Sequence, residues 1–161
     1  MKVARLPYIL VILVFLLVSC SASSEAAFEA GKRAYDRGNY AGALERWRPL
    51  ANRGHAEAQY WLGHMYGLGE GVRRNDTEST RWFRRAAEQG HDGAQGALGD
   101  AYVFGWGVRE DPVLAYKWTL LAAMQGDPGS RAVLEVRRDE LTPAQVREAK
   151  TLAREWLAKQ K

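Results

Sequence analysis

A chain of 161 residues has room for one domain, and its hydrophobic content of 47% is typical of a protein with a folded core. The formal net charge is +4. Two of the cations, Lys2 and Arg5, lie within the first 19 residues, and no long run of one sign follows them. Charge therefore provides no argument for a nucleic-acid partner, and we expect none.

Residues 1–19 are predicted to be a signal peptide. The basic residues Lys2 and Arg5 precede an apolar run from Tyr8 to Val18, which is the layout of a secretory signal. This run is too short for a comfortable bilayer span of roughly 20 residues. The only cysteine, Cys20, follows directly, so a disulfide within one chain is excluded.

The four residues ending at this cysteine, LVSC, resemble the lipobox of bacterial lipoproteins. The resemblance implies cleavage before Cys20 and lipidation of its thiol, so that residues 20–27 would be a lipidated cysteine and a short flexible tether. Because Ser21 and not aspartate follows, the resemblance also implies the outer membrane of a Gram-negative bacterium, with the protein facing the periplasm. Cleavage after a small residue such as Ala22 is the alternative, and it would release a soluble periplasmic or secreted protein.

The remaining chain contains an internal repeat of 36 residues. Residues 55–90 align with residues 91–126 without a gap, and fifteen positions are identical. The shared residues include paired histidines, glutamines, glycines and tryptophans, such as His55/His91, Gln59/Gln95, Gly69/Gly105, Gly71/Gly107 and Trp82/Trp118. A fixed period of this length is the signature of a repeat protein, so self-similarity decides the fold class.

Each repeat is predicted to be a helical hairpin. Ala58, Leu62 and Tyr66 are spaced by four, which places them on one face of a first helix. Trp82 and Ala86 have the same spacing in a second helix. We expect Asn75 and Asp111 to cap the second helices, and His55 and His91 to be structural turn residues. Trp47, Trp82 and Trp118 are predicted core residues.

Partial units flank the two complete repeats. Residues 28–54 form a first unit with a shortened loop, and the solenoid of residues 28–161 then has units at about 28–54, 55–90 and 91–126. Residues 127–161 form a capping region. In it, Thr142 is the predicted cap of a last helix, with Gln145 at the capping-box position. The polar face of this helix would close the solenoid against solvent.

The pattern AEAQYWLGHMYGLGEGV, followed by a tryptophan and AAEQG, resembles the Sel-one-like repeat family, a relative of the tetratricopeptide repeat. The opening GNYAGALERWRPLANRG and the closing LTPAQVREAKTLAREW resemble the end units of such proteins. The resemblance covers about Ala27 to Trp156. It implies an all-α solenoid of helix-turn-helix repeats with a capping C-terminal helix, and a function in protein–protein interaction.

Catalytic and cofactor chemistry find no support in the sequence. Gly67, Gly69 and Gly71 suggest a phosphate-binding loop, but no strand precedes them and no Lys-Ser/Thr pair follows. No HExxH motif or pair of histidines four residues apart suggests zinc. We therefore expect no enzyme activity, cofactor or metal.

Residues that break the repeat are the candidates for specificity. We predict that Tyr60, His64, Met65, Asp100 and Trp106 contribute to a partner-binding surface, although packing inside the fold is an equal alternative for Met65. The expected function is that of a membrane-tethered periplasmic adaptor without catalytic activity, which binds another envelope protein. The alternative is a module that binds cell-wall peptidoglycan.

Overall fold

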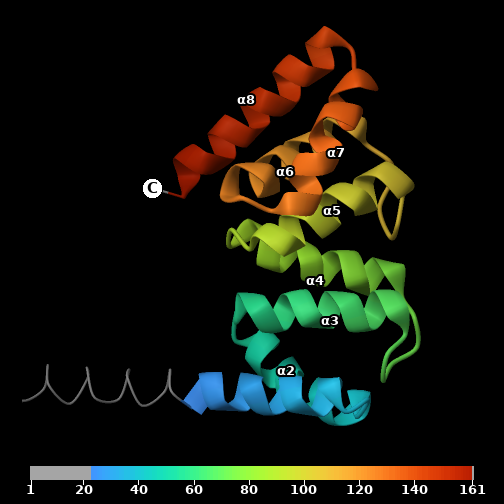
Figure 1. The fold of residues 1–161 in the computed structure, drawn as a ribbon, viewed down its shortest axis with the longest axis vertical. Helices are drawn as coiled ribbons and strands as arrows, with labels where there is room; N and C mark the ends of the chain where they lie inside the picture. Colours follow the sequence, from blue (N-terminus) through green and yellow to red (C-terminus); the bar gives the residue numbers. More distant parts are fainter. Residues whose placement is uncertain (1–22, 161) are drawn as a thin grey trace, which may run out of the picture.

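The computed structural model describes residues 23–160, and every regular element within that range is a helix. The helices follow one another along the long axis of the molecule (Figure 1), which confirms the predicted all-α solenoid. The predicted signal peptide and Cys20 lie outside the described residues. In chain order, the elements are a first helix over residues 23–36, α2 (Tyr40–Asn52), α3 (Ala56–Leu68), α4 (Asp76–Glu88), α5 (Asp92–Phe104), α6 (Pro112–Gln125), α7 (Pro128–Asp139) and α8 (Pro143–Lys159).

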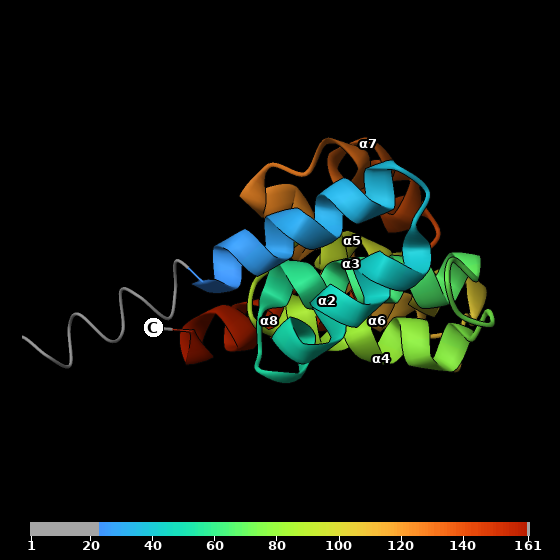
Figure 2. The same ribbon diagram turned by 90° about the horizontal axis from the view of Figure 1, so that it is seen from below.

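The helices alternate between two rows. The first helix, α3, α5 and α7 open successive units and are called A helices here; α2, α4 and α6 close them and are called B helices. Packing alternates along the chain, because α3 packs on α4 within one unit and α4 packs on α5 of the next. In the view from below (Figure 2), α5 and α7 lie above α4 and α6. Neighbouring units therefore meet through a B helix and the A helix that follows it.

Side-chain caps fix where the repeat helices begin. His55 and His91 start α3 and α5, and in each the ring Nδ1 accepts the backbone N–H three residues further on, at 3.1 and 3.2 Å. Asn75 and Asp111 cap α4 and α6 through side-chain oxygens, at 3.1 and 2.9 Å. Thr142 forms the predicted capping box at the start of α8. The caps predicted from the sequence are confirmed, and the repeating histidines are structural residues, as expected.

The core follows the repeat. Trp47, Trp82 and Trp118, from the three B helices, are exposed by only 0%, 6% and 5%, as predicted. Leu62 and Leu98, at equivalent positions of α3 and α5, are fully buried. Each such side chain contributes about 1.5–3 kcal/mol relative to exposure. Burial therefore connects α3 and α5 to the B helices on both sides.

Buried glutamines form a second repeating element. The Gln59 side-chain amide donates to the Ala51 carbonyl at 2.9 Å, and its oxygen accepts from Gln89 at 2.7 Å. Gln95 and Gln125 repeat this arrangement one unit later, with bonds of 3.2 Å to the preceding B helix and 2.8 Å to each other. Gln59 and Gln95 are exposed by only 4% and 0%. This ladder explains why both glutamine pairs recur in the sequence.

The glycine-rich loops connect successive units as well as the helices of one hairpin. Gly69 ends α3 in the left-handed conformation, with φ of 78°. Gly71 lies against Tyr40 at the start of α2, where an added Cβ would come within 2.9 Å of the Tyr40 backbone. Gly107 lies even closer to α4, since a Cβ would be 2.3 Å from the Asp76 carbonyl oxygen. Each loop thus contacts the first turn of the preceding B helix.

The predicted flexible tether is wrong for its described part. Residues 23–27 belong to the first helix, and alanine and glutamate in this stretch favour a helix. Phe28 anchors that helix, because it is 6% exposed and its ring stacks on Trp47 and His55, with centroid distances of 5.7 and 5.2 Å. Among residues 23–160, none of the helices has the length and apolar character needed to span a membrane.

The capping region consists of two helices with different contacts. α8 packs on α6, with the Trp156 ring edge-on to Trp118 at 6.1 Å. α7 occupies the place of the next A helix, and its buried side is polar. Arg137 is only 9% exposed, whereas Val133 and Val136 are 38% and 61% exposed. Val133 and Val136 of α7 therefore face solvent.

Candidate functional site

Four of the five predicted partner residues line one hollowed face. His64, Asp100 and Trp106 line a cavity of about 290 Å³ between α3, α4 and α5, which we call the loop-side cavity. Tyr60, His64 and Asp100 line a second cavity of about 330 Å³ between α3, α5 and α7, called the cap-side cavity. Ala97 also lines both. The two cavities adjoin and form a groove along the A helices.

Met65 is the exception, and its prediction as a surface residue is wrong. Its side chain is fully buried in the core with Trp47 and Leu62. Met65 directly follows His64, so it points about 100° away around a helix of 3.6 residues per turn. The equivalent residue Ala101 is 2% exposed. Methionine in one repeat and alanine in the next differ in volume at this position, but both side chains are buried in the core.

Small residues hollow out the loop-side cavity. Gly63 and Gly67 of α3 and Ala97 and Ala101 of α5 line it, together with the ring of Phe83. The two hydroxyls in the lining are already engaged with the backbone. The Ser79 hydroxyl donates to the Gly63 carbonyl at 2.7 Å, and the Thr80 hydroxyl donates to the Trp106 carbonyl at 2.6 Å. The surface left between these residues is therefore predominantly apolar.

The cavity is bordered by exposed apolar side chains. Trp106 is 47% exposed and stacks on Phe104, which is 56% exposed, with ring centroids 4.7 Å apart. Leu68, at the end of α3, is 65% exposed. Leu68 and Trp106 come from two successive units, whose hairpin loops lie on the same side of the stack (Figure 1). Grouped apolar side chains around a hollow are typical of an interaction surface.

The charged groups in the groove are paired with one another. Arg74 and Asp76 form an ion pair at 2.9 Å beside the loop-side cavity. Asp100 accepts a hydrogen bond from Arg137 of α7, and the same guanidinium donates to Thr119 of α6. Asp100 is thus engaged within the fold while its side chain remains 47% exposed. The sequence contained no signal for Arg137, because a charged residue in a capping helix is expected to face solvent.

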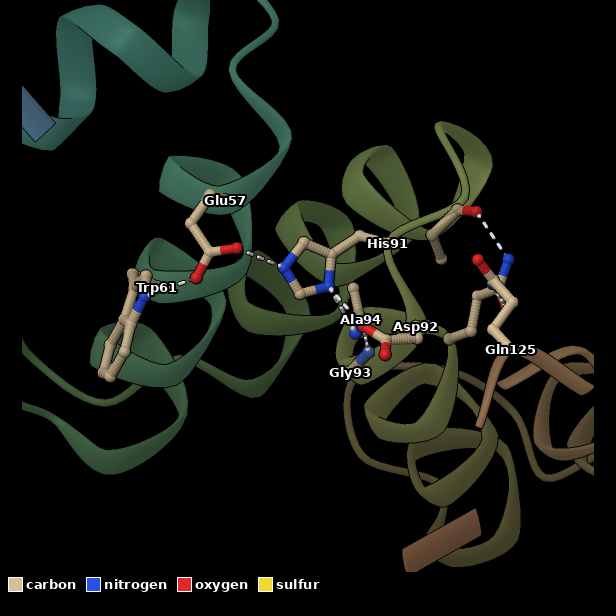
Figure 3. A network of polar contacts seen from close by, with 9 residues as sticks. Glu57, Trp61, His91, Asp92, Gly93, Ala94 and Gln125 are labelled. Atoms are coloured by element: carbon tan, nitrogen blue, oxygen red, sulfur yellow. Dashed lines mark hydrogen bonds and ion pairs between the residues drawn. The ribbon is translucent and has the colours of Figure 1, made fainter. Parts of the chain in front are cut away.

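Tyr60 lies at the centre of a group of rings that joins α3 to α5. Its ring stacks on His91 and meets His64 edge-on, both with centroids 4.5 Å apart. His91 Nε2 lies 2.9 Å from a Glu57 carboxylate oxygen, and the other oxygen accepts from the Trp61 indole at 3.0 Å (Figure 3). The hydrogen bond with His91 holds the pKa of Glu57 below its usual value. The ring contacts hold Tyr60 and His64 in place, and both line the cap-side cavity.

We predict that His64 makes stability depend on pH. Burial beside Tyr60 and Phe83 lowers the pKa of His64, so the folded state favours the neutral ring. Unfolded histidine binds a proton near pH 6.5, and stability is therefore lost as pH falls below that value toward the lowered folded pKa. Denaturation between pH 7.5 and 5 should show a smaller loss for His64→Gln than for the wild type. Parallel profiles would contradict this assignment.

Within residues 23–160, no group of three or more histidine, cysteine, aspartate or glutamate side chains is arranged to hold a metal ion. The groove offers an apolar lining and charged groups that are paired with one another. These are properties of a binding surface.

Comparisons with known proteins agree with this architecture. The Sel1 repeat model matches residues 56–91 and 93–127. The crystal structure of a Sel1 repeat protein from Oxalobacter formigenes is 34% identical, with a TM-score of 0.66, over 77% of this chain and 96% of that one. The chain belongs to the Sel1 repeat family. The two family matches coincide with the hairpin units 55–90 and 91–126 to within two residues. Sel1 repeat proteins generally serve as scaffolds for protein interaction.

Two longer proteins share the Sel1 repeats of this chain. A protective antigen of uropathogenic Escherichia coli strains, with an SLR fold, is 28% identical with a TM-score of 0.79, over 84% of this chain and 30% of the antigen. An exopolysaccharide production negative regulator of Rhizobium meliloti (strain 1021) is 39% identical over 54 residues, which are 34% of this chain and 20% of the regulator. This Sel1 repeat protein thus spans less than a third of either relative.

Proposed function

We propose that this Sel1 repeat protein is a non-catalytic adaptor that binds another protein of the cell envelope through its groove. The observation that carries the proposal is the gathering of Tyr60, His64, Asp100 and Trp106 on one hollowed face. These residues differ between the repeats, while the residues that are identical serve the fold. The general role of the family in protein interaction supports the proposal. The exposed Trp106 also supports it, because tryptophan is enriched among the residues that contribute most to binding at protein interfaces.

In-cell photocrosslinking tests the adaptor proposal directly. A photoreactive residue at Leu68 or Phe104, both exposed beside the loop-side cavity, is expected to capture a defined protein that mass spectrometry identifies. The same residue at Arg81, which is exposed on α4, is the matched control and should not capture it. Trp106→Ala should reduce capture at least tenfold, since exposed aromatic anchors carry much of the binding energy of an interface.

Other results of this experiment would point to a different function. Equal capture from position 81, or no capture from the groove, would contradict the adaptor proposal. Retention of the protein on purified peptidoglycan, lost in Trp106→Ala, would instead favour cell-wall binding by the same surface. Trp106→Ala keeps the backbone carbonyl that accepts from Thr80, so we expect the variant to stay folded.

The membrane tether is a second part of the proposal. The lipobox-like LVSC motif supports lipidation of Cys20, and an outer-membrane anchor facing the periplasm. Residue 23 is already helical, and three residues of extended chain reach only about 10 Å. A lipid on Cys20 would therefore keep the first unit close to the membrane surface.

Replacing Cys20 with serine tests this tether. The variant is expected to accumulate as an unprocessed precursor that incorporates no labelled fatty acid, because the lipidated thiol is absent. Cell fractionation and acyl labelling measure the two effects. Cleavage after Ala22 in both variant and wild type would show that the protein is released as a soluble form.

A further inference from the structure

We propose that the loop-side cavity is a receptor for one aromatic side chain, a tryptophan or tyrosine presented by a segment of the partner protein. This inference rests on the proposed adaptor function and specifies what the adaptor recognises. It is carried by a comparison between joints of the same solenoid, where a joint is the contact between one unit and the A helix of the next.

Two independent contacts establish which positions of the first and second joints are equivalent. Phe28 stacks on the cap His55 at 5.2 Å, and Tyr60 stacks on the cap His91 at 4.5 Å. The second contact is between a glycine and a ring. A Cβ added to Gly31 would lie 2.4 Å from the Trp47 ring, and a Cβ added to Gly63 would lie 2.5 Å from the Phe83 ring. The first helix and α3 are thus offset by 32 residues, whereas later helices are offset by 36.

In the first joint, aromatic side chains fill the space. The Trp61 ring lies between Tyr35 and Trp47, with centroid distances of 5.0 and 5.4 Å. Tyr35 also contacts Trp47 at 5.7 Å, and its hydroxyl donates to Glu70 at 2.6 Å. The first joint therefore shows that two aromatic rings can be accommodated between these helices.

The second joint lacks both of these rings. By the offsets above, Gly67 stands where the first joint has Tyr35, and Ala97 stands where it has Trp61. Gly67 and Ala97 both line the cavity of about 290 Å³. The Phe83 ring, at the position of Trp47, remains as one wall. The cavity is therefore the space that aromatic side chains occupy one unit earlier.

The third joint is filled in another way. Gly99 is equivalent to Gly63, and a Cβ there would meet Thr119 Oγ1 at 2.7 Å and the Arg137 guanidinium at 3.0 Å. Arg137 enters this joint from α7 and bonds to Thr119 and Asp100. At the third joint, a side chain of this protein, Arg137, thus fills the space between the helices. At the second joint, we infer that a side chain of the partner fills the equivalent space.

The chemistry of the lining favours an uncharged aromatic ring. The hydroxyls of Ser79 and Thr80 are engaged with backbone carbonyls, and Arg74 is paired with Asp76. A charged ligand would find no unpaired counter-charge among these groups. The carboxylates of Asp76 and Asp100 line the same cavity and can accept the N–H of an indole or the O–H of a phenol. The exposed apolar residues at the entrance, Leu68 and Trp106, would flank the neighbouring residues of the partner segment.

The proposal is tested with N-acetyltryptophanamide as the probe and the full-length chain as the receptor. We expect saturable, millimolar binding in NMR titrations, with shifts at the methyl groups of Ala97 and Ala101 and at the Trp106 indole. N-acetylalaninamide should produce no such shifts. Shifts that do not saturate, or that lie away from these groups, would overturn the assignment of the cavity.

A variant that restores the missing ring gives the decisive comparison. Ala97→Trp places in the second joint the residue that occupies the first, and it should abolish probe binding while the protein stays folded. Ala158→Trp, on an exposed position of α8, adds the same side chain elsewhere and should bind the probe like the wild type. Should Ala97→Trp fail to fold, Ala101→Met, which copies the equivalent Met65, should weaken binding at least threefold. Unchanged binding in the folded variant would overturn the proposal.

The same variants separate this inference from the adaptor function. If Ala97→Trp folds and still captures the crosslinked partner from position 68, the groove binds a protein, but the cavity is not its aromatic receptor. If capture is lost together with probe binding, both proposals hold. Dimerisation of the wild type in sedimentation experiments, lost in Ala97→Trp, would show that the occupant is a second copy of this chain, which would also overturn the proposed partner.

Discussion

Replacing Gly107 with alanine is expected to lower the free energy of unfolding by about 2–5 kcal/mol. Part of this cost, about 1–2 kcal/mol, arises because Gly107 has a φ of 66°, which disfavours residues with a side chain. The larger part arises because the new Cβ would lie 2.3 Å from the Asp76 carbonyl oxygen, and relieving such an overlap requires backbone shifts that cost about 1–3 kcal/mol. Chemical denaturation measures the difference.

Other glycines of the same chain separate the two contributions. Gly38 has a φ of 74° but no atom within 4 Å of an added Cβ, so Gly38→Ala should cost only about 1–2 kcal/mol. Gly71, with a φ of 71° and a Cβ distance of 2.9 Å to the Tyr40 backbone, should lie between the two. Equal effects at Gly38 and Gly107 would show that the loop does not pack against the start of α4 as described.

Most of this fold could be predicted from the sequence because each pattern occurs in both copies of the repeat. His55 and His91, or Asn75 and Asp111, occur at the same place in both copies, so each cap supports the assignment of the other. The sequence could not reveal which unit a recurring residue contacts. Gly107 recurs because of Asp76 in the preceding unit, and that proximity exists only after the helices have stacked.

The candidate site was only partly predictable for a related reason. The rule that specificity lies where the repeat is broken located His64, Asp100 and Trp106 on one face. It was wrong for Met65, since a residue can differ between repeats and still face the core. The rule also considers only side chains that could contact a partner, and it does not detect an empty space between helices. The loop-side cavity arises from side chains that are missing, at Gly67 and Ala97.

The buried glutamine ladder leads to the second large effect. Gln95 is fully buried, donates to the Ala87 carbonyl at 3.2 Å and accepts from Gln125 at 2.8 Å. An amide suits this position because it offers a donor on one side and an acceptor on the other. Glutamate has the same shape but, when ionised, can only accept. Its carboxylate would be buried facing the Ala87 carbonyl, which is itself an acceptor.

Gln95→Glu should therefore destabilise the protein by about 3 kcal/mol or more at pH 7, as expected for a buried charge without a full set of partners. Burial would raise the pKa of the new carboxyl above the usual value near 4.3. The deficit relative to the wild type should therefore shrink as pH falls, because the protonated acid can donate to Ala87. Ala158→Glu, which introduces the same charge at an exposed position of α8 outside the ladder, is the control and should cost less than about 1 kcal/mol. Chemical denaturation of both variants at pH 7 and pH 5 measures the free energies of unfolding. If the stability lost in Gln95→Glu does not change with pH, the ladder does not depend on the N–H donor of Gln95.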